Sequence, residues 1–209
     1  MRRAGLLTLI LIFGASLAAA ASLRIDSFDC RLDLTEAGRL EVTEELTVTF
    51  LTPHHGIERW IPVSYRVPAT GENLTIALRV EDARMDGSSV PYAVGRKGRD
   101  KLIRIGDPDR TIIGTHVYEI AYTASRILLF HTDYLQLYWN VTGNDWRVPI
   151  ARATASIGIP DTVDPSLVSS TSYAGYYGSG ARGGEGTIDD AGRLNFASGP
   201  LSPLSLIHI

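Results

Sequence analysis

The sequence predicts an all-β fold, specifically an antiparallel β-sandwich of seven or more strands preceded by a signal peptide. Apolar and polar residues alternate with a period of two along several segments, whereas helical periodicity is hard to find. Turn-forming residues separate these segments, and 44% of the residues are apolar, which suits a globular chain with a core. Alternation of this kind is typical of antiparallel sheets covered on one side, and two such sheets packed face to face form a sandwich.

Residues 1–21 have the features of a secretory signal peptide. Two arginines follow the first methionine, residues 4–15 are mostly apolar, and a run of alanines leads up to Ser22. Small residues at these positions suit a signal peptidase, so we expect cleavage after Ala20 or Ala21. An uncleaved membrane anchor is the alternative, because the apolar stretch nearly reaches the ~20 residues that a spanning helix needs.

The sandwich domain is expected over residues 22–203, with one strand at each alternating segment. These segments are residues 28–34, 40–50, 74–80, 80–85, 90–94, 102–105, 112–122, 135–141, 151–159 and 188–196. Asp86-Gly87 is a good hairpin signal, and an Asp-Pro-Asp turn lies at residues 107–109. The apolar faces predict a core that buries Leu46, Val48, Leu78, Leu137, Trp139 and Ile157 together.

Charge and cysteine content exclude several classes of partner. Without residues 1–21 the chain carries 18 basic and 23 acidic residues, a formal net charge of −5. Affinity for nucleic acid comes mainly from Lys and Arg against phosphates, so we expect no nucleic-acid partner. Cys30 is the single cysteine, which rules out an intrachain disulfide, and zinc-site spacings are missing. We expect no catalytic residue, because the sequence contains no nucleophile elbow. We also expect no metal and no cofactor.

Glu44 interrupts the apolar face of the segment at residues 40–50. A buried carboxylate without a partner costs several kcal/mol, and Arg59 on the next expected strand is the best candidate partner. We therefore predict a structural ion pair between Glu44 and Arg59 beneath the sheet, with the two strands running antiparallel. The alternative is that Glu44 lies in water at a sheet margin.

Aromatic residues gather in one region of the sequence. Tyr134 and Tyr138 lie on the polar face of the segment at residues 135–141, and Trp146 follows it. Exposed aromatic side chains can bind sugars or proteins, so Tyr134, Tyr138 and Trp146 are a candidate binding surface. Aromatic pairs are also common cross-strand partners, which is the simpler interpretation.

The last residues, 204–209, form an abrupt apolar end, LSLIHI. They look like translated sequencing adaptor, so we expect the natural protein to continue and these residues to lack a settled place in the core. The alternative is a genuine apolar end that begins a strand.

Three segments carry a family resemblance. They are GIERWIP at residues 56–62, IGDPD at 105–109 followed by GTHVYEIAY at 114–122, and WNVTGNDWRVPI at 139–150. In this order they resemble the YciQ-like predicted bacterial membrane proteins of domain-of-unknown-function family 2207. The resemblance covers roughly residues 23–204, and it implies an exported β-rich domain followed by transmembrane helices, which this chain does not contain. It implies no established activity.

We expect an exported, extracytoplasmic domain, held at the cell membrane by a C-terminal anchor outside this chain, that binds an unknown protein or envelope component without catalysis. A cell-envelope hydrolase or carbohydrate-active enzyme is the alternative, and it would need two carboxylates facing one cleft. An assembly module that uses an exposed sheet edge is a third hypothesis.

Overall fold

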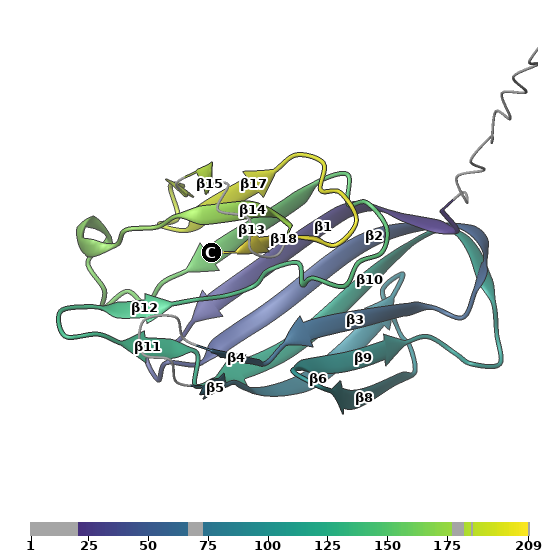
Figure 1. Cartoon of the computed structure of the whole chain (residues 1–209), viewed down its shortest axis with the longest axis horizontal. Helices are drawn as coiled ribbons and strands as arrows, with labels where there is room; N and C mark the ends of the chain where they lie inside the picture. The colour runs from purple at the N-terminus through teal and green to yellow at the C-terminus, as the bar shows by residue number, and fades with distance from the viewer. Residues whose placement is uncertain (1–20, 67–72, 177–181, 185, 209) are drawn as a thin grey trace, which may run out of the picture.

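The computed structural model describes residues 21–66, 73–176, 182–184 and 186–208, and nearly all of its regular structure is β-strand (Figure 1). Its one helical element is a 3-10 turn, η1 (Pro165–Leu167), and none of the described residues forms a helix long and apolar enough to cross a bilayer. The predicted all-β class is therefore confirmed. The predicted signal peptide lies outside the described residues, apart from its last position.

The eight-stranded sheet is the larger layer, with the order β16-β17-β13-β1-β2-β10-β6-β7. Its strands are β1 (Leu23–Leu34), β2 (Leu40–His54), β6 (Ala77–Met85), β7 (Ser88–Ser89), β10 (Ile112–Ser125), β13 (Ala153–Gly158), β16 (Thr187–Ile188) and β17 (Leu194–Ser198). All neighbours are antiparallel except β1 and β13, which are parallel, so the sheet is mixed rather than purely antiparallel as predicted. A tight hairpin forces two strands to be antiparallel, whereas β13 is reached by a long connection that leaves its direction open.

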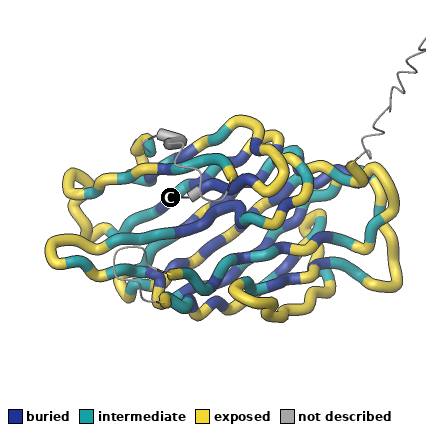
Figure 2. The backbone as a smooth tube through the Cα atoms, in the orientation of Figure 1, coloured by how far each residue is buried: buried dark blue, intermediate teal, exposed yellow. Residues whose placement is uncertain are grey.

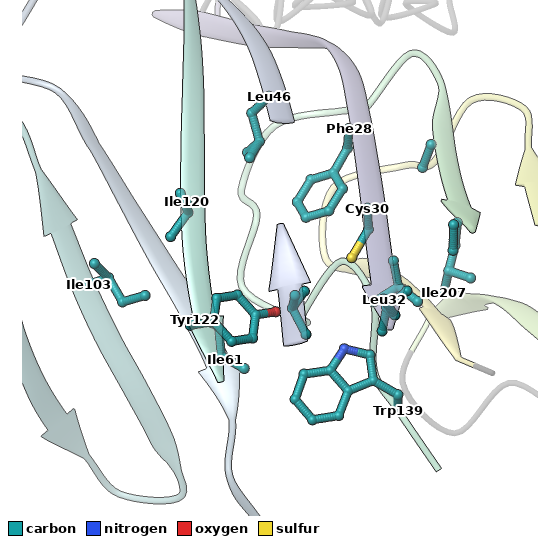
Figure 3. Close-up of a cluster of buried hydrophobic side chains, with 14 of the residues drawn as sticks. Phe28, Cys30, Leu32, Leu46, Ile61, Ile103, Ile120, Tyr122, Trp139 and Ile207 are labelled. Atoms are coloured by element: carbon teal, nitrogen blue, oxygen red, sulfur yellow. The ribbon is translucent and has the colours of Figure 1, made fainter. Parts of the chain in front are cut away.

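Four smaller sheets make up the second layer, and Figure 1 shows them over one face of the large sheet. Two of them have three strands: one contains β3 (Ile57–Pro62), β8 (Tyr92–Lys97) and β9 (Asp100–Ile105), and the other contains β14 (Ser172–Tyr176), β15 (Arg182–Gly184) and β18 (Ser205–His208). The other two have two strands: β4 (Ser64–Arg66) pairs with β5 (Asn73–Thr75), and β11 (Leu128–Phe130) pairs with β12 (Leu135–Leu137). Buried segments follow the middle of the long strands, and exposed ones lie at the loops (Figure 2). The sandwich buries its apolar side chains between the two layers, and Figure 3 shows part of this core.

The predicted core residues are buried, with one exception. Leu46, Val48, Leu78, Trp139 and Ile157 are each at most 8% exposed. The exception is Leu137, which packs against the core but is only partly buried.

The segment at residues 135–141 is not one strand, contrary to the prediction. Only β12 forms a strand, and its first residue, Leu135, is 59% exposed. Trp139 and Val141 are buried in the core but lie in irregular chain after this strand. The backbone of Val141 has partners other than β11: its carbonyl oxygen accepts from the guanidinium of Arg59, and its amide donates to the carbonyl of Ile207.

Neither of two predicted turns closes a long hairpin: the first closes the short hairpin of β6 and β7, and the second connects the layers. Asp86 and Gly87 both have positive φ, as in the primed turns of two-residue hairpins, but β7 ends after two residues and the chain crosses over to β8. The Asp-Pro-Asp turn at residues 107–109 joins β9 to β10, which lie in different sheets. The predicted strand at residues 90–94 is therefore shifted to β8 and pairs with β9.

The C-terminal residues have a place in the core, so the prediction that they lack one is wrong for residues 205–207. β18 pairs with β14, and Leu206 and Ile207 are 5% and 3% exposed. The Ile207 amide donates to Oγ1 of Thr142 over 2.9 Å, and its carbonyl accepts from the Val141 amide over 2.9 Å. Apolar side chains and open hydrogen-bonding groups on β14 accommodate this segment, whereas Leu204 remains 49% exposed.

Gly56 and Gly106 mark the point where two connections between the layers touch. Both have φ values in the region that favours glycine, 137° and 142°. An ideal Cβ on Gly56 would lie 1.9 Å from the carbonyl oxygen of Ile105, and one on Gly106 would lie 1.9 Å from that of His55. No side chain fits there, because the obstacle is backbone rather than a movable side chain.

We expect Gly56→Ala and Gly106→Ala each to lower the free energy of unfolding by more than about 3 kcal/mol, because the two backbones must separate. Gly87→Ala is the matched control: its φ is also positive, but nothing lies within 4 Å of an added Cβ. The control should lose only ~1–2 kcal/mol. Urea unfolding of the three variants measures the difference, and equal losses would show that the close approach is unimportant.

Candidate functional site

The structure brings Glu44 and Arg59 together at the centre of the sandwich. The period-two pattern of β2 turns Glu44 toward the second layer, and β3 turns Arg59 back toward the first. Both side chains are 0% exposed. The two strands belong to different sheets, so the ion pair joins the layers; the prediction that neighbouring antiparallel strands would carry it is wrong. Strand β3 pairs with β9 instead, because the chain changes layer at Gly56.

The Arg59 guanidinium uses all of its donors. Its Nε and Nη2 each donate to one Glu44 oxygen over 2.7 Å, which is the two-pronged geometry that suits a carboxylate. Nη2 also donates to the Val141 carbonyl over 2.8 Å, and Nη1 donates to the carbonyls of Thr142 and Trp60 over 2.9 and 2.6 Å. A buried cation is tolerated only with such partners, so this network offsets the loss of hydration.

Tyr122 completes the network on the side of the large sheet. Its hydroxyl donates to Oε1 of Glu44 over 2.6 Å, and its ring stacks on Trp139 with centroids 6.3 Å apart. Figure 3 shows Tyr122, Trp139 and Cys30 in this part of the core. Sequence reasoning missed Tyr122, although its position on the apolar face of the segment at residues 112–122 was a usable signal.

Burial and the neighbouring charges shift the pKa values of Arg59, Tyr122 and Cys30. Burial alone would lower the pKa of Arg59, but the charge of Glu44 and its hydrogen bonds raise it, so the guanidinium stays charged. Burial and then the Glu44 carboxylate raise the pKa of the Tyr122 hydroxyl and that of the Cys30 thiol. Cys30 therefore remains a thiol in the core and is a poor nucleophile. The shifts favour the charged guanidinium of Arg59 and the neutral forms of Tyr122 and Cys30.

The three aromatic residues of the candidate binding surface are not brought together. Tyr134 is 60% exposed and stacks on His131, with centroids 4.3 Å apart. Tyr138 meets the ring of Tyr65 edge-on, with centroids 5.6 Å apart. Trp146 is only 8% exposed, and its Nε1 donates to a backbone carbonyl in the core. Placing Trp146 on a surface was therefore wrong, because its indole N–H finds a partner inside.

Two clefts open on the described part of the surface. The first, of about 420 Å³, lies between the layers beside β6 and β10, and four arginines and one lysine line it. The second, of about 830 Å³, lies beside the turn between β8 and β9 and contains Trp60, Asp100 and Asp145. Burial, and then the charge of Asp145, raise the pKa of Asp100. Neither cleft could be predicted from the sequence, because the lining residues of each are far apart in the chain.

We expect Glu44→Ala and Arg59→Ala each to cost about 3–5 kcal/mol of stability, because each strands a buried charge. The double variant should lose clearly less than the sum of the single losses. Glu58 and Arg104 provide the control, since they form a 2.9 Å ion pair on the outside of β3 and β9 with 49% and 67% exposure. A double-mutant cycle on Glu58 and Arg104 should give a coupling energy below ~1 kcal/mol. Denaturant unfolding gives both cycles, and additive losses at the buried pair would contradict the prediction.

Comparison with solved structures places the fold beside those of larger enzymes. Native leukotriene A4 hydrolase from Saccharomyces cerevisiae aligns with a TM-score of 0.53 and 12% identity, over 90% of this chain and 29% of that chain. The yeast enzyme in complex with bestatin aligns with a TM-score of 0.52 and 13% identity, over 90% and 28%. An M1 zinc metallopeptidase from Deinococcus radiodurans gives a TM-score of 0.47 and 15% identity, over 90% and 42%. At these identities the likeness concerns the fold alone, and the chain spans less than a third of the yeast enzyme.

No curated protein sequence matches the chain. A family model described as the N-terminal domain of a predicted membrane protein, DUF2207, matches residues 24–209. This match includes the three segments that carry the sequence resemblance, and it confirms the resemblance to family 2207. The chain belongs to the DUF2207 family of predicted membrane proteins and corresponds to their N-terminal domain.

Proposed function

We propose that this domain lies on the extracytoplasmic side of the cell membrane and binds a protein or envelope component without catalysing a reaction. The family description supports membrane association. The export signal expected at residues 1–21 supports the extracytoplasmic side.

The observation that carries the proposal is the difference between the buried charged groups and those that line the clefts. The central charges are saturated: Arg59 uses every donor, and Glu44 accepts from Arg59 and Tyr122, so these groups maintain the frame. Other charged groups, which a ligand could reach, line the two clefts. A rigid sandwich that presents charged clefts is suited to binding, because its recognition groups are held in place by the core.

One observation favours the alternative, a cell-envelope hydrolase or carbohydrate-active enzyme. Asp100 and Asp145 share the second cleft, and the raised pKa of Asp100 is a property of carboxyl groups that act as general acids. The same cleft holds Lys97 and Arg99, however, and Arg99 lowers the pKa of Asp100. Cations and carboxylates placed side by side suit the binding of a charged ligand, so binding remains the preferred function.

The test is hydrolysis of peptidoglycan fragments and peptides by the purified chain. We expect no turnover, and we expect Asp100→Asn and Asp145→Asn to behave like the parent chain. Asp161→Asn, which changes an exposed carboxylate away from both clefts, serves as the control. Turnover that Asp100→Asn and Asp145→Asn abolish and Asp161→Asn preserves would make the domain an enzyme and overturn the proposal.

The location is tested by the N-terminus of the protein recovered from a bacterial envelope fraction. We expect mass spectrometry to find Ala21 or Ser22 as the first residue, because a signal peptidase cleaves after small residues. An intact N-terminal segment in the membrane fraction would show an uncleaved anchor. An intact segment in the cytosol would contradict export.

A further inference from the structure

The first cleft concentrates positive charge on an otherwise acidic chain. Among the described residues, its charged lining consists of one carboxylate, Glu81, and five cations: Arg39, Arg79, Arg96, Lys101 and Arg126. These residues come from the approach to β2, from β6, β8 and β9, and from the end of β10, so the fold gathers them from five places. The chain as a whole has a formal net charge of −3, so this excess is local.

Several of these cations have no partner in the part of the chain that the structure describes. Within the described residues, no ion pair or side-chain hydrogen bond engages the charged ends of Arg39, Lys101 or Arg126. The single carboxylate is already engaged: Glu81 lies 3.5 Å from Nε of Arg79 and accepts from the Thr123 hydroxyl over 3.2 Å. Like charges gathered around one cleft repel one another, and an anion bound between them would relieve that repulsion.

The remaining lining includes hydroxyl-bearing and apolar residues. Thr75, Thr123 and Ser125 line the same cleft, as do the buried residues Ile76 and Leu78. Guanidinium groups match the oxygens of phosphate in pairs, and hydroxyls can satisfy further phosphate oxygens. A volume of about 420 Å³ admits a small head group.

We propose that this cleft binds a phosphate group carried by a small molecule or by a lipid head group. The inference rests on the proposed function, because it names the ligand class of the binding module. A phosphate fits better than a single carboxylate, since it offers more oxygens to a ring of arginines and hydroxyls.

The experiment measures binding of the purified chain to two probes at one fixed salt concentration. The soluble probe is glycerol 3-phosphate, with succinate as the carboxylate comparison. The membrane probe is vesicles of phosphatidylglycerol with phosphatidylcholine, compared with vesicles of phosphatidylcholine alone. The cleft variant is Arg39→Gln with Lys101→Gln, and the control is Arg110→Gln, which removes an exposed charge from the turn between β9 and β10.

We expect saturable binding of a phosphate probe that the cleft variant weakens roughly tenfold or more, while Arg110→Gln leaves it nearly unchanged. Binding to glycerol 3-phosphate alone indicates a soluble phosphate ligand, and binding to the anionic vesicles indicates a lipid head group. No saturable binding, an equal loss in Arg110→Gln, or tighter binding of succinate would overturn the inference. Those outcomes differ from turnover dependent on Asp100 and Asp145, which would instead overturn the proposed function.

Discussion

The ion pair between Glu44 and Arg59 is the interaction on which the rest of the structure depends. It joins the two layers at their centre, with one partner on β2 and the other on β3. Through Arg59 it also holds the carbonyls of Val141 and Thr142, so the irregular chain after β12 is tied to the same point. A buried pair of this kind need not add net stability, but it specifies one arrangement, because any shift would leave a charge unpaired.

Constraints on the backbone act together with this pair. The chain changes layer at Gly56 and Gly106, whose backbones touch, and the change at Gly56 places β3 so that Arg59 faces β2. If β3 had continued as a hairpin partner of β2, the guanidinium would have lain in the same sheet as the carboxylate. Because the chain crosses between the layers here, Glu44 and Arg59, which are close in the sequence, contact each other from different layers.

The sequence predicted those features that depend on local alternation. The strand faces around Leu46 and Ile157 were predictable because burial follows a period of two, and the same pattern identified Glu44 as a buried charge. The change of sheet at Gly56 was not predictable, since pairing depends on contacts between distant segments. For the same reason the basic cleft was missed: Arg39 and Lys101 are separated by 61 positions and meet only in the fold. Trp146 was misplaced because its backbone partner lies in irregular chain.

Hydrogen exchange of a variant that removes both charges, Glu44→Leu with Arg59→Met, tests the central claim most directly. These side chains fill similar space without stranding a charge, so the sandwich itself should persist. If Arg59 organises the irregular segment, amides at residues 139–148 should exchange faster in the variant, while those of β1, β2 and β10 keep their protection. Unchanged protection at residues 139–148 would show that apolar packing alone holds this segment and would contradict the account.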